Sequence, residues 1–203
     1  MSKEKTILIC NQKGGVGKTL VADELAFGFD RDGIPYNLYD LDQQGGSVHK
    51  EVRNDNAVVG IVDTPGALQV ITMQEGKPVT LSDLMKDADL IIIPTKMTPR
   101  DLQPFLTMID LIKQNKIKAP VFYVFNEWNR YRATAEFEEW FKEAFPISIY
   151  YRIPKSEGFT QAALEGKSIL EHREYKSSFA AMQIRELVSA VEYLLGLKET
   201  EDK

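Results

Sequence analysis

The chain has 203 residues, of which 43% are hydrophobic and 27% charged, a composition typical of globular rather than disordered proteins. Its 25 basic and 30 acidic residues give a formal net charge of −5, which argues against a dedicated high-affinity nucleic-acid-binding protein. The single cysteine excludes an internal disulfide and a multi-cysteine metal or iron–sulfur site within one chain. We expect a cytoplasmic protein, because no apolar stretch approaches the ~18 residues of a membrane span and no signal peptide fits the N-terminus.

The predicted elements alternate between strands and helices along the chain. Short β-favouring apolar runs predict strands at residues 6–10, 36–41, 57–62, 90–94, 121–125 and 147–153. Apolar side chains at helical spacing predict helices at residues 20–29, 100–115, 133–144, 158–164 and 179–195. Gly33 and Pro94 are expected to end the first helix and the fourth strand. In the least regular segment, 73–87, Thr80 or Ser82 is expected to cap a short helix.

This alternation predicts βαβ units with right-handed crossovers. The expected fold class is therefore α/β, with three layers: a mostly parallel sheet and helices on both of its faces. No repeat, linker or composition break divides the sequence. Residues 1–203 are accordingly expected to form a single domain.

The strongest motif runs from Lys13 to Thr19, with the sequence Lys-Gly-Gly-Val-Gly-Lys-Thr between the first strand and the first helix. A glycine-rich turn there points backbone N–H groups at an anion, and the following helix adds the positive end of its dipole. Lys18 can reach the terminal phosphates of a nucleotide, and the Thr19 hydroxyl can bind Mg²⁺. The ordinary P-loop has a glycine where this chain has Gln12, so the motif is a variant with a second lysine. We predict a phosphate-binding loop and hence a P-loop NTPase fold.

Carboxylates follow at the ends of two strands. Asp63 ends the third strand, at the sheet edge where α/β proteins hold ligands, and is predicted to bind Mg²⁺ directly or through water. Asp40 and Asp42 flank Leu41 at the end of the second strand, and residues two apart on a strand share a face. Capping of the following turn or helix is the alternative role for all three aspartates.

The run from Asn11 to Thr19 resembles the deviant Walker A motif of the ParA/MinD ATPases. The resemblance extends over nearly the whole chain: residues 40–44 are similar to switch I, 63–66 to switch II, and 153–155 with 162–167 to the stretch beside the adenine. With no N-terminal DNA-binding extension, the chain is most similar to the small, ParF-like plasmid-partition members of that family.

The resemblance implies a slow, Mg²⁺-dependent ATPase with ATP as its ligand. Its catalytic set would be Lys13, Lys18 and Asp42. Asp42 would orient and polarise the attacking water, because phosphoryl transfer needs mainly positioning and charge neutralisation. Lys13 would reach across a two-fold interface to the nucleotide of a second copy, so the active form would be an ATP-dependent homodimer.

The same resemblance assigns the remaining nucleotide contacts. The metal ligands would be Thr19 and Asp63. Asn126 would contact the adenine through its amide, and Pro154 would pack against the base, although an asparagine after a strand is also a common turn residue. The phosphates would be bound by Gly14, Gly15, Val16, Gly17, Lys18, Thr19 and Leu20.

Three features depart from the family pattern. Leu20 replaces the usual second threonine, which removes a hydroxyl contact to the α-phosphate. Gln43 replaces the proline of switch I, so that segment is expected to be less rigid. Residues 74–86 form an insertion after switch II, where a partner or the second copy would lie.

The expected function is that of a partition ATPase. Its ATP-bound dimer would bind non-specific DNA and associate with the nucleoid, and a centromere-binding, ParB-like adaptor would stimulate hydrolysis. Two basic clusters are candidate phosphate contacts: Arg130 with Arg132, and Lys167 with Arg173, Lys176 and Arg185.

Two alternative functions stay open. The first is a MinD-like positioning ATPase acting on a membrane or a protein cargo. The sequence after the last helix, 198–203, is mixed in charge and not a basic apolar anchor, so no membrane binding is expected. The second is a metabolic P-loop synthetase, which would need a second substrate pocket for which the sequence shows no signature.

Overall fold

The computed structural model of the chain describes residues 3–41, 52–66, 70–74 and 77–198. Its main sheet has six parallel strands in the order β2-β3-β1-β6-β7-β8. These strands are β1 (Lys5–Ile9), β2 (Tyr36–Asp40), β3 (Val59–Asp63), β6 (Leu90–Lys96), β7 (Val121–Trp128) and β8 (Ile149–Pro154). An antiparallel hairpin forms a separate two-stranded sheet, from β4 (Val70–Gln74) and β5 (Lys77–Thr80).

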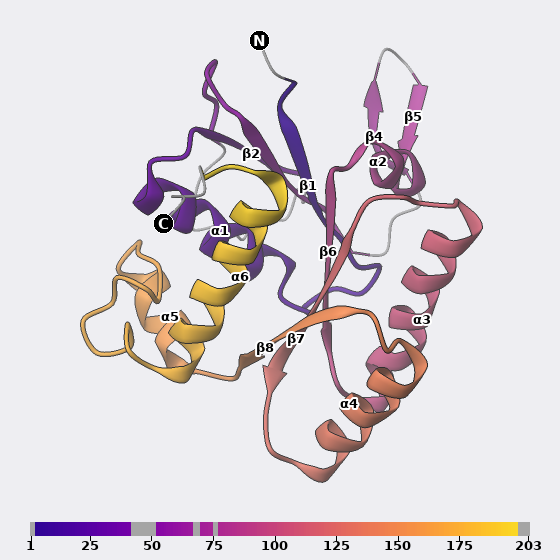
Figure 1. Ribbon diagram of the computed structural model, residues 1–203, viewed down its shortest axis with the longest axis vertical. Coiled ribbons are helices and arrows are strands. Elements are labelled where there is room, and N and C mark those ends of the chain that lie inside the picture. The colour runs from indigo at the N-terminus through magenta and orange to yellow at the C-terminus, as the bar shows by residue number, and fades with distance from the viewer. Residues whose placement is uncertain (1–2, 42–51, 67–69, 75–76, 199–203) are drawn as a thin grey trace, which may run out of the picture.

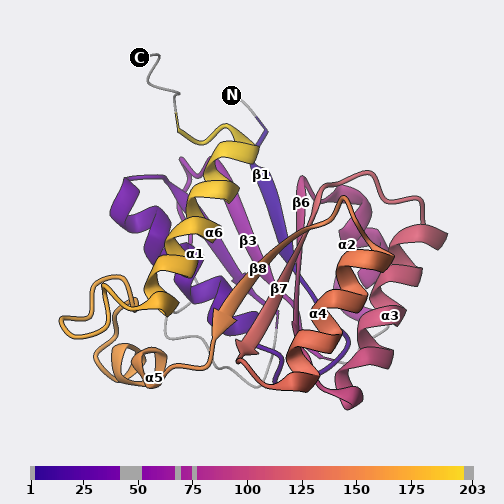
Figure 2. The same ribbon diagram turned by 60° about the horizontal axis from the view of Figure 1, so that its bottom comes forward.

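Helices cover both faces of the main sheet (Figures 1 and 2). α1 and α6 lie on one face, and α2, α3 and α4 lie on the other. The helices are α1 (Lys18–Asp32), α2 (Leu81–Asp87), α3 (Pro99–Gln114), α4 (Arg132–Ala144), α5 (Glu157–Leu164) and α6 (Phe179–Leu195).

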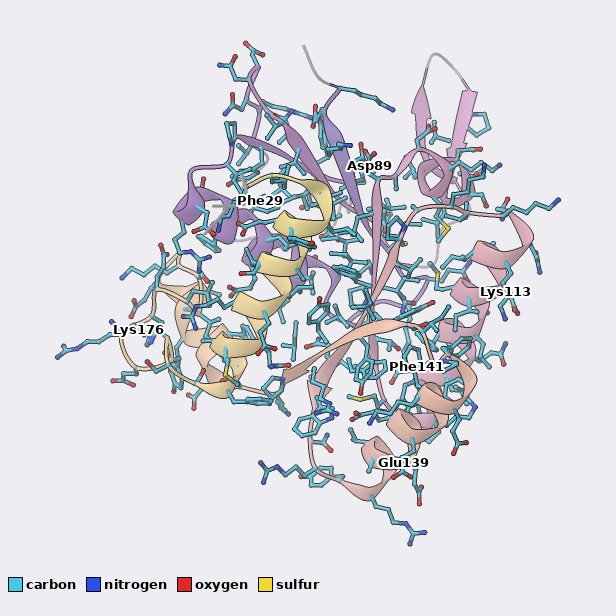
Figure 3. The ribbon with its side chains drawn as sticks, viewed as in Figure 1. Phe29, Asp89, Lys113, Glu139, Phe141 and Lys176 are labelled. Atoms are coloured by element: carbon cyan, nitrogen blue, oxygen red, sulfur yellow. The ribbon has the colours of Figure 1, made fainter. Side chains whose placement is uncertain are left out.

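Each face of the sheet has its own apolar core. Phe29 of α1 belongs to the first core and Phe141 of α4 to the second, and neither has exposed surface. Figure 3 places these two rings on the α1 and α4 sides of the sheet. Burial of the central strands on both faces explains why their sequences are continuously apolar rather than alternating. The three-layer α/β architecture predicted from the sequence is confirmed.

The boundaries of the first and last long helices follow from local capping. α1 ends at Gly33, whose φ of 68° is left-handed, as the sequence predicted. α6 begins after Ser178, whose side chain accepts a hydrogen bond from the Ala181 N–H, and ends at left-handed Gly196.

Two expectations about the middle of the chain need correction. Pro94 does not end its strand, because β6 continues to Lys96. β1 pairs with β6 only as far as Ile92, so the missing N–H of Pro94 removes no hydrogen bond from that ladder. The segment 73–87 contains part of a hairpin as well as a helix, and the helix is capped by Thr80 rather than Ser82.

Because the six strands are parallel, their carboxyl ends meet at one edge of the sheet, and the glycine loop follows β1 at this edge. Within the described ranges, no helix is long and apolar enough to cross a membrane.

Candidate nucleotide-binding site

The glycine loop between β1 and α1 has a backbone that requires glycine. Gly15 has a φ of 70°, and Gly17, the N-cap of α1, has a φ of 102°. Side chains rarely tolerate these left-handed values, so substitution at either position would strain the loop. Val16 between them is buried. The loop therefore presents backbone groups rather than side chains at the N-terminus of a 15-residue helix, which suits an anion.

Asn11 fixes the start of the loop. The residue is 1% exposed, and its Nδ2 donates a hydrogen bond of 2.7 Å to the carbonyl of Pro94 within β6. Its Oδ1 accepts a hydrogen bond of 2.9 Å from the Lys13 N–H. The same Pro94 that was expected to end a strand thus supplies the carbonyl that anchors the loop.

Lys18 folds back over the loop from the first turn of α1. Only 6% of the residue is exposed, and its ammonium donates to the Lys13 carbonyl at 3.3 Å. The cation therefore lies against the start of the loop, where phosphate oxygens would give it a stronger, charge-assisted partner than a neutral carbonyl.

Thr19 and Asp63 come together beside the loop, from α1 and the end of β3. The Thr19 hydroxyl donates to Asp63 Oδ2 at 2.7 Å, and Asp63 is 1% exposed. A hydroxyl and a carboxylate are hard oxygen ligands of the kind that Mg²⁺ prefers, and Mg²⁺ usually takes only one or two such groups from a protein. The chemistry of this donor pair fits the predicted metal.

The segment after β3 lies directly against the glycine loop. A Cβ placed on Gly66 would be 2.9 Å from the backbone nitrogen of Gly14, so only glycine permits this approach. The Thr64 hydroxyl donates to the Ile9 carbonyl at 3.0 Å, which joins the same segment to the end of β1. The residues that resemble switch II are thus in contact with the glycine loop.

The end of β2 lies beside Asp63, on the edge of β3 that faces away from β1. Asp40 pairs with Asp63 in the parallel register, and the Leu41 N–H donates to the Asp63 carbonyl at 2.9 Å. Asp42, the predicted water-positioning carboxylate, lies outside the described residues, as do Gln43 and Gln44.

Lys13 contacts a residue that the sequence analysis did not identify. Its ammonium forms an ion pair with Asp101 in the first turn of α3 and donates to the Arg100 carbonyl at 3.2 Å. The Asp101 side chain is 3% exposed and also accepts a hydrogen bond from the Thr98 hydroxyl. An aspartate three residues after a threonine resembles an ordinary helix cap. That local pattern contains no signal of a partner in the glycine loop.

The two predicted base contacts lie at the ends of the neighbouring strands β7 and β8. Asn126 is 6% exposed, and its Nδ2 donates a hydrogen bond of 2.9 Å to the carbonyl of Val16 in the loop. Pro154 ends β8 opposite Trp128. Leu20 packs its side chain against the core on the α1 side. The adenine roles of Asn126 and Pro154 stay predictions.

Glu24, further along α1, connects the loop helix to the segment after α5. Its carboxylate accepts hydrogen bonds from the Ser168 hydroxyl at 2.5 Å and the Ile169 N–H at 3.1 Å. Burial raises the pKa of Glu24 to about 7 and that of the Cys10 thiol, at the end of β1, to about 12. Cys10 is therefore an inert packing group, whereas Glu24 titrates near neutral pH.

The comparisons with known proteins agree with this fold. The family described as the CobQ/CobB/MinD/ParA nucleotide binding domain matches residues 7–169. No curated protein matches the sequence.

Solved structures with the same fold cover nearly all of the chain. McdA from Cyanothece, in a complex with ATP, has a TM-score of 0.72 at 15% identity and covers 98% of this chain and 99% of its own. MinD from Pyrococcus horikoshii, with Mg-ADP, has a TM-score of 0.71 at 15% identity, covering 97% and 99%. A plasmid partition protein from Borrelia burgdorferi has a TM-score of 0.62 at 12% identity, covering 95% and 99%.

Proposed function

Because the chain belongs to the CobQ/CobB/MinD/ParA family of nucleotide-binding domains, we propose that it is a single-domain ATPase that binds ATP with Mg²⁺ and hydrolyses it slowly. The observation that carries this proposal is the hydrogen bond between Thr19 and Asp63. It lies beside a loop in which two glycines have left-handed φ values and against which the Lys18 ammonium lies. The ATP and Mg-ADP in the McdA and MinD structures support the choice of ligand.

Each residue of the site has a defined role in this proposal. The backbone N–H groups of residues 14–20 and the Lys18 ammonium bind the phosphates, and Thr19 and Asp63 hold the metal. Mg²⁺ supplies neutralisation of phosphate charge when it is bound. Asp42 orients the attacking water.

Lys13 completes the site of a second copy in this proposal, so the active form is an ATP-dependent homodimer. In the single chain the Lys13 ammonium is engaged by Asp101 and the Arg100 carbonyl. Dimerisation therefore exchanges an intramolecular ion pair for a contact with the phosphates of the partner's nucleotide. Because the phosphates carry more charge than one carboxylate, ATP favours that exchange.

We further propose that the ATP-bound dimer binds non-specific DNA on the nucleoid and is released when a centromere-binding adaptor stimulates hydrolysis. The segment between α5 and α6 carries three residues of the larger basic cluster, and the fourth, Arg185, lies in α6. Lys176 extends from this segment away from the body of the molecule (Figure 3). Lys167 in this cluster pairs with Glu165 at 3.1 Å. A net charge of −5 means that DNA binding is weak and falls steeply with salt.

Measurement of molecular mass in solution tests the nucleotide switch. The chain is mixed with Mg²⁺ and either ADP or ATP, and phosphate release is followed in parallel. We expect a monomer with ADP, a dimer with ATP and slow release of phosphate. A mass that is the same with both nucleotides would contradict the switch, and binding of neither nucleotide would contradict the ATPase assignment.

A further inference from the structure

The end of β7 has an irregular backbone next to the glycine loop. The register with β8 shifts between Asn126 and Trp128, and Glu127 between them has a φ of 54°. Among the described residues, the only other non-glycine residue with a positive φ is Lys116. A glutamate persists in this region only where its surroundings determine the conformation.

Three contacts hold this bulge. Asn126 Oδ1 accepts a hydrogen bond of 2.9 Å from the Glu127 N–H, and Asn129 Nδ2 donates one of 3.3 Å to the Glu127 carbonyl. The Glu127 carboxylate forms an ion pair of 2.7 Å with Lys96 at the end of β6. The bulge therefore fixes the direction in which the Asn126 side chain points.

That direction is toward the peptide between Val16 and Gly17. Asn126 Nδ2 donates to the Val16 carbonyl at 2.9 Å, across 110 positions in the sequence. A Cβ on Gly17 would lie 2.2 Å from the same nitrogen, so the amide is packed against the loop as well as hydrogen-bonded to it. The contact is buried.

The orientation of this peptide matters for phosphate binding. In a planar trans peptide the N–H points opposite to the carbonyl. A Val16 carbonyl held by Asn126 therefore turns the Gly17 N–H away from Asn126, and this N–H belongs to the set that would bind phosphate. The contact acts on phosphate binding without any need to touch the nucleotide.

We propose that Asn126 is a positioning residue that holds the Val16–Gly17 peptide in its phosphate-binding orientation. The inference rests on the proposed nucleotide binding and deepens it. It differs from the role implied by the resemblance, in which the same amide contacts the adenine. The two roles predict different losses of ligand affinity when the amide is removed: a base contact affects only ligands with a base, whereas a residue that orients the loop affects every phosphate ligand.

The test compares three ligands with the wild-type chain and Asn126→Ala: ADP, inosine diphosphate and inorganic pyrophosphate. Inosine diphosphate changes only the edge of the base, and pyrophosphate has no base. If Asn126 braces the loop, the variant binds all three about five- to tenfold more weakly, because one hydrogen bond is lost. The ratio of ADP to inosine diphosphate affinities stays that of the wild type.

Controls separate this effect from damage to the fold. Asn115→Ala removes an amide that donates to the Leu111 carbonyl, at the opposite end of α3 from Asp101, and it should bind pyrophosphate within twofold of the wild type. If Asn126→Ala does not fold, Asn126→Ser replaces it, because serine keeps a side-chain acceptor near the Glu127 N–H but is too short to reach Val16.

Two results would overturn the proposal. One is unchanged pyrophosphate affinity with loss of the preference between the two diphosphates, which would make Asn126 a base contact. The other is a variant that binds all three ligands like the wild type. A wild-type chain that binds none of the three would instead contradict the proposed function.

Discussion

Lys13 of the glycine loop and Asp101 of helix α3 form an ion pair within one chain. The carboxylate is buried, whereas one third of the lysine side chain is exposed. The residue proposed to reach a second copy is therefore engaged by its own chain. In the proposed dimer, release of Lys13 from Asp101 would be a required step, and its free energy would set how readily ATP drives dimerisation.

Asp101→Asn should make dimerisation easier. Asparagine keeps an acceptor for the Thr98 hydroxyl but removes the charge that holds Lys13. Because the lysine is partly solvated, we expect the ATP-dependent dimer to tighten about fivefold, or ~1 kcal/mol. Sedimentation equilibrium with a non-hydrolysable ATP analogue measures this. Asp110→Asn, at an exposed position of the same helix, is the control. Equal dimer dissociation constants for both variants would show that the Lys13–Asp101 ion pair does not oppose dimerisation.

The two lysines of the loop should fail in different ways. Lys18→Ala should abolish ATP binding, because it removes the cation that lies against the loop. Lys13→Ala should keep nucleotide affinity within about twofold in the monomer but lose the dimer, because its proposed contact is with the second nucleotide. Titration calorimetry and solution mass separate the two, with Lys113→Ala on α3 as a surface control. An ATP-dependent dimer of Lys18→Ala would contradict the proposal that the glycine loop binds ATP through Lys18.

Asp42→Ala tests the proposed hydrolytic role. We expect normal ATP affinity, phosphate release reduced by at least about 100-fold, and a dimer that persists after ATP is added. The readouts are single-turnover phosphate release and dimer lifetime. Asp40→Ala, two residues earlier on β2, is the matched comparison. Hydrolysis at the wild-type rate would show that another group positions the water.

Glu24 should make stability depend on pH in a defined window. Burial raises its pKa from 4.5 to about 7, so between these values the folded chain binds more protons than the unfolded chain. The favourable contribution of protonated Glu24 is complete below pH 4.5 and is lost as the pH rises through 7. The loss is at most about 3 kcal/mol.

Urea unfolding of Glu24→Gln across this window checks the effect. Because glutamine does not titrate, the free energy of unfolding of the variant should rise relative to that of the wild type as the pH rises from 4.5 to 7. Glu143→Gln, at an exposed position of α4 on the other face of the sheet, should run parallel to the wild type. A constant difference between Glu24→Gln and the wild type at every pH would show that Glu24 does not titrate there.

The fold was predictable from the sequence wherever local signals act alone. α6 begins after Ser178 and ends at Gly196, because a side-chain cap and a left-handed glycine are properties of single positions. Pro94 misled the strand assignment because its effect depends on whether β1 still pairs beside it. The hairpin β4–β5 was not anticipated, since its strands are short and one contains Pro78.

Some contacts of the candidate site were likewise predictable from the sequence, and others depend on the tertiary arrangement. Thr19 and Asp63 were predictable because the order of βα units brings strand ends to one edge. Asp101 was not, because its pairing with Lys13 depends on where α3 starts relative to the loop. For Asn126 the motif indicated the position but not the contact with Val16, which depends on the bulge at Glu127.

DNA binding in different nucleotide states tests the central claim most directly. The chain is mixed with non-specific duplex DNA in low and moderate salt, with no nucleotide, ADP, ATP or a non-hydrolysable ATP analogue. The account predicts binding only with ATP or the analogue, and a loss of that binding as salt rises. Tight ATP binding without DNA binding in any state would contradict it and point to a membrane or a protein cargo as the partner.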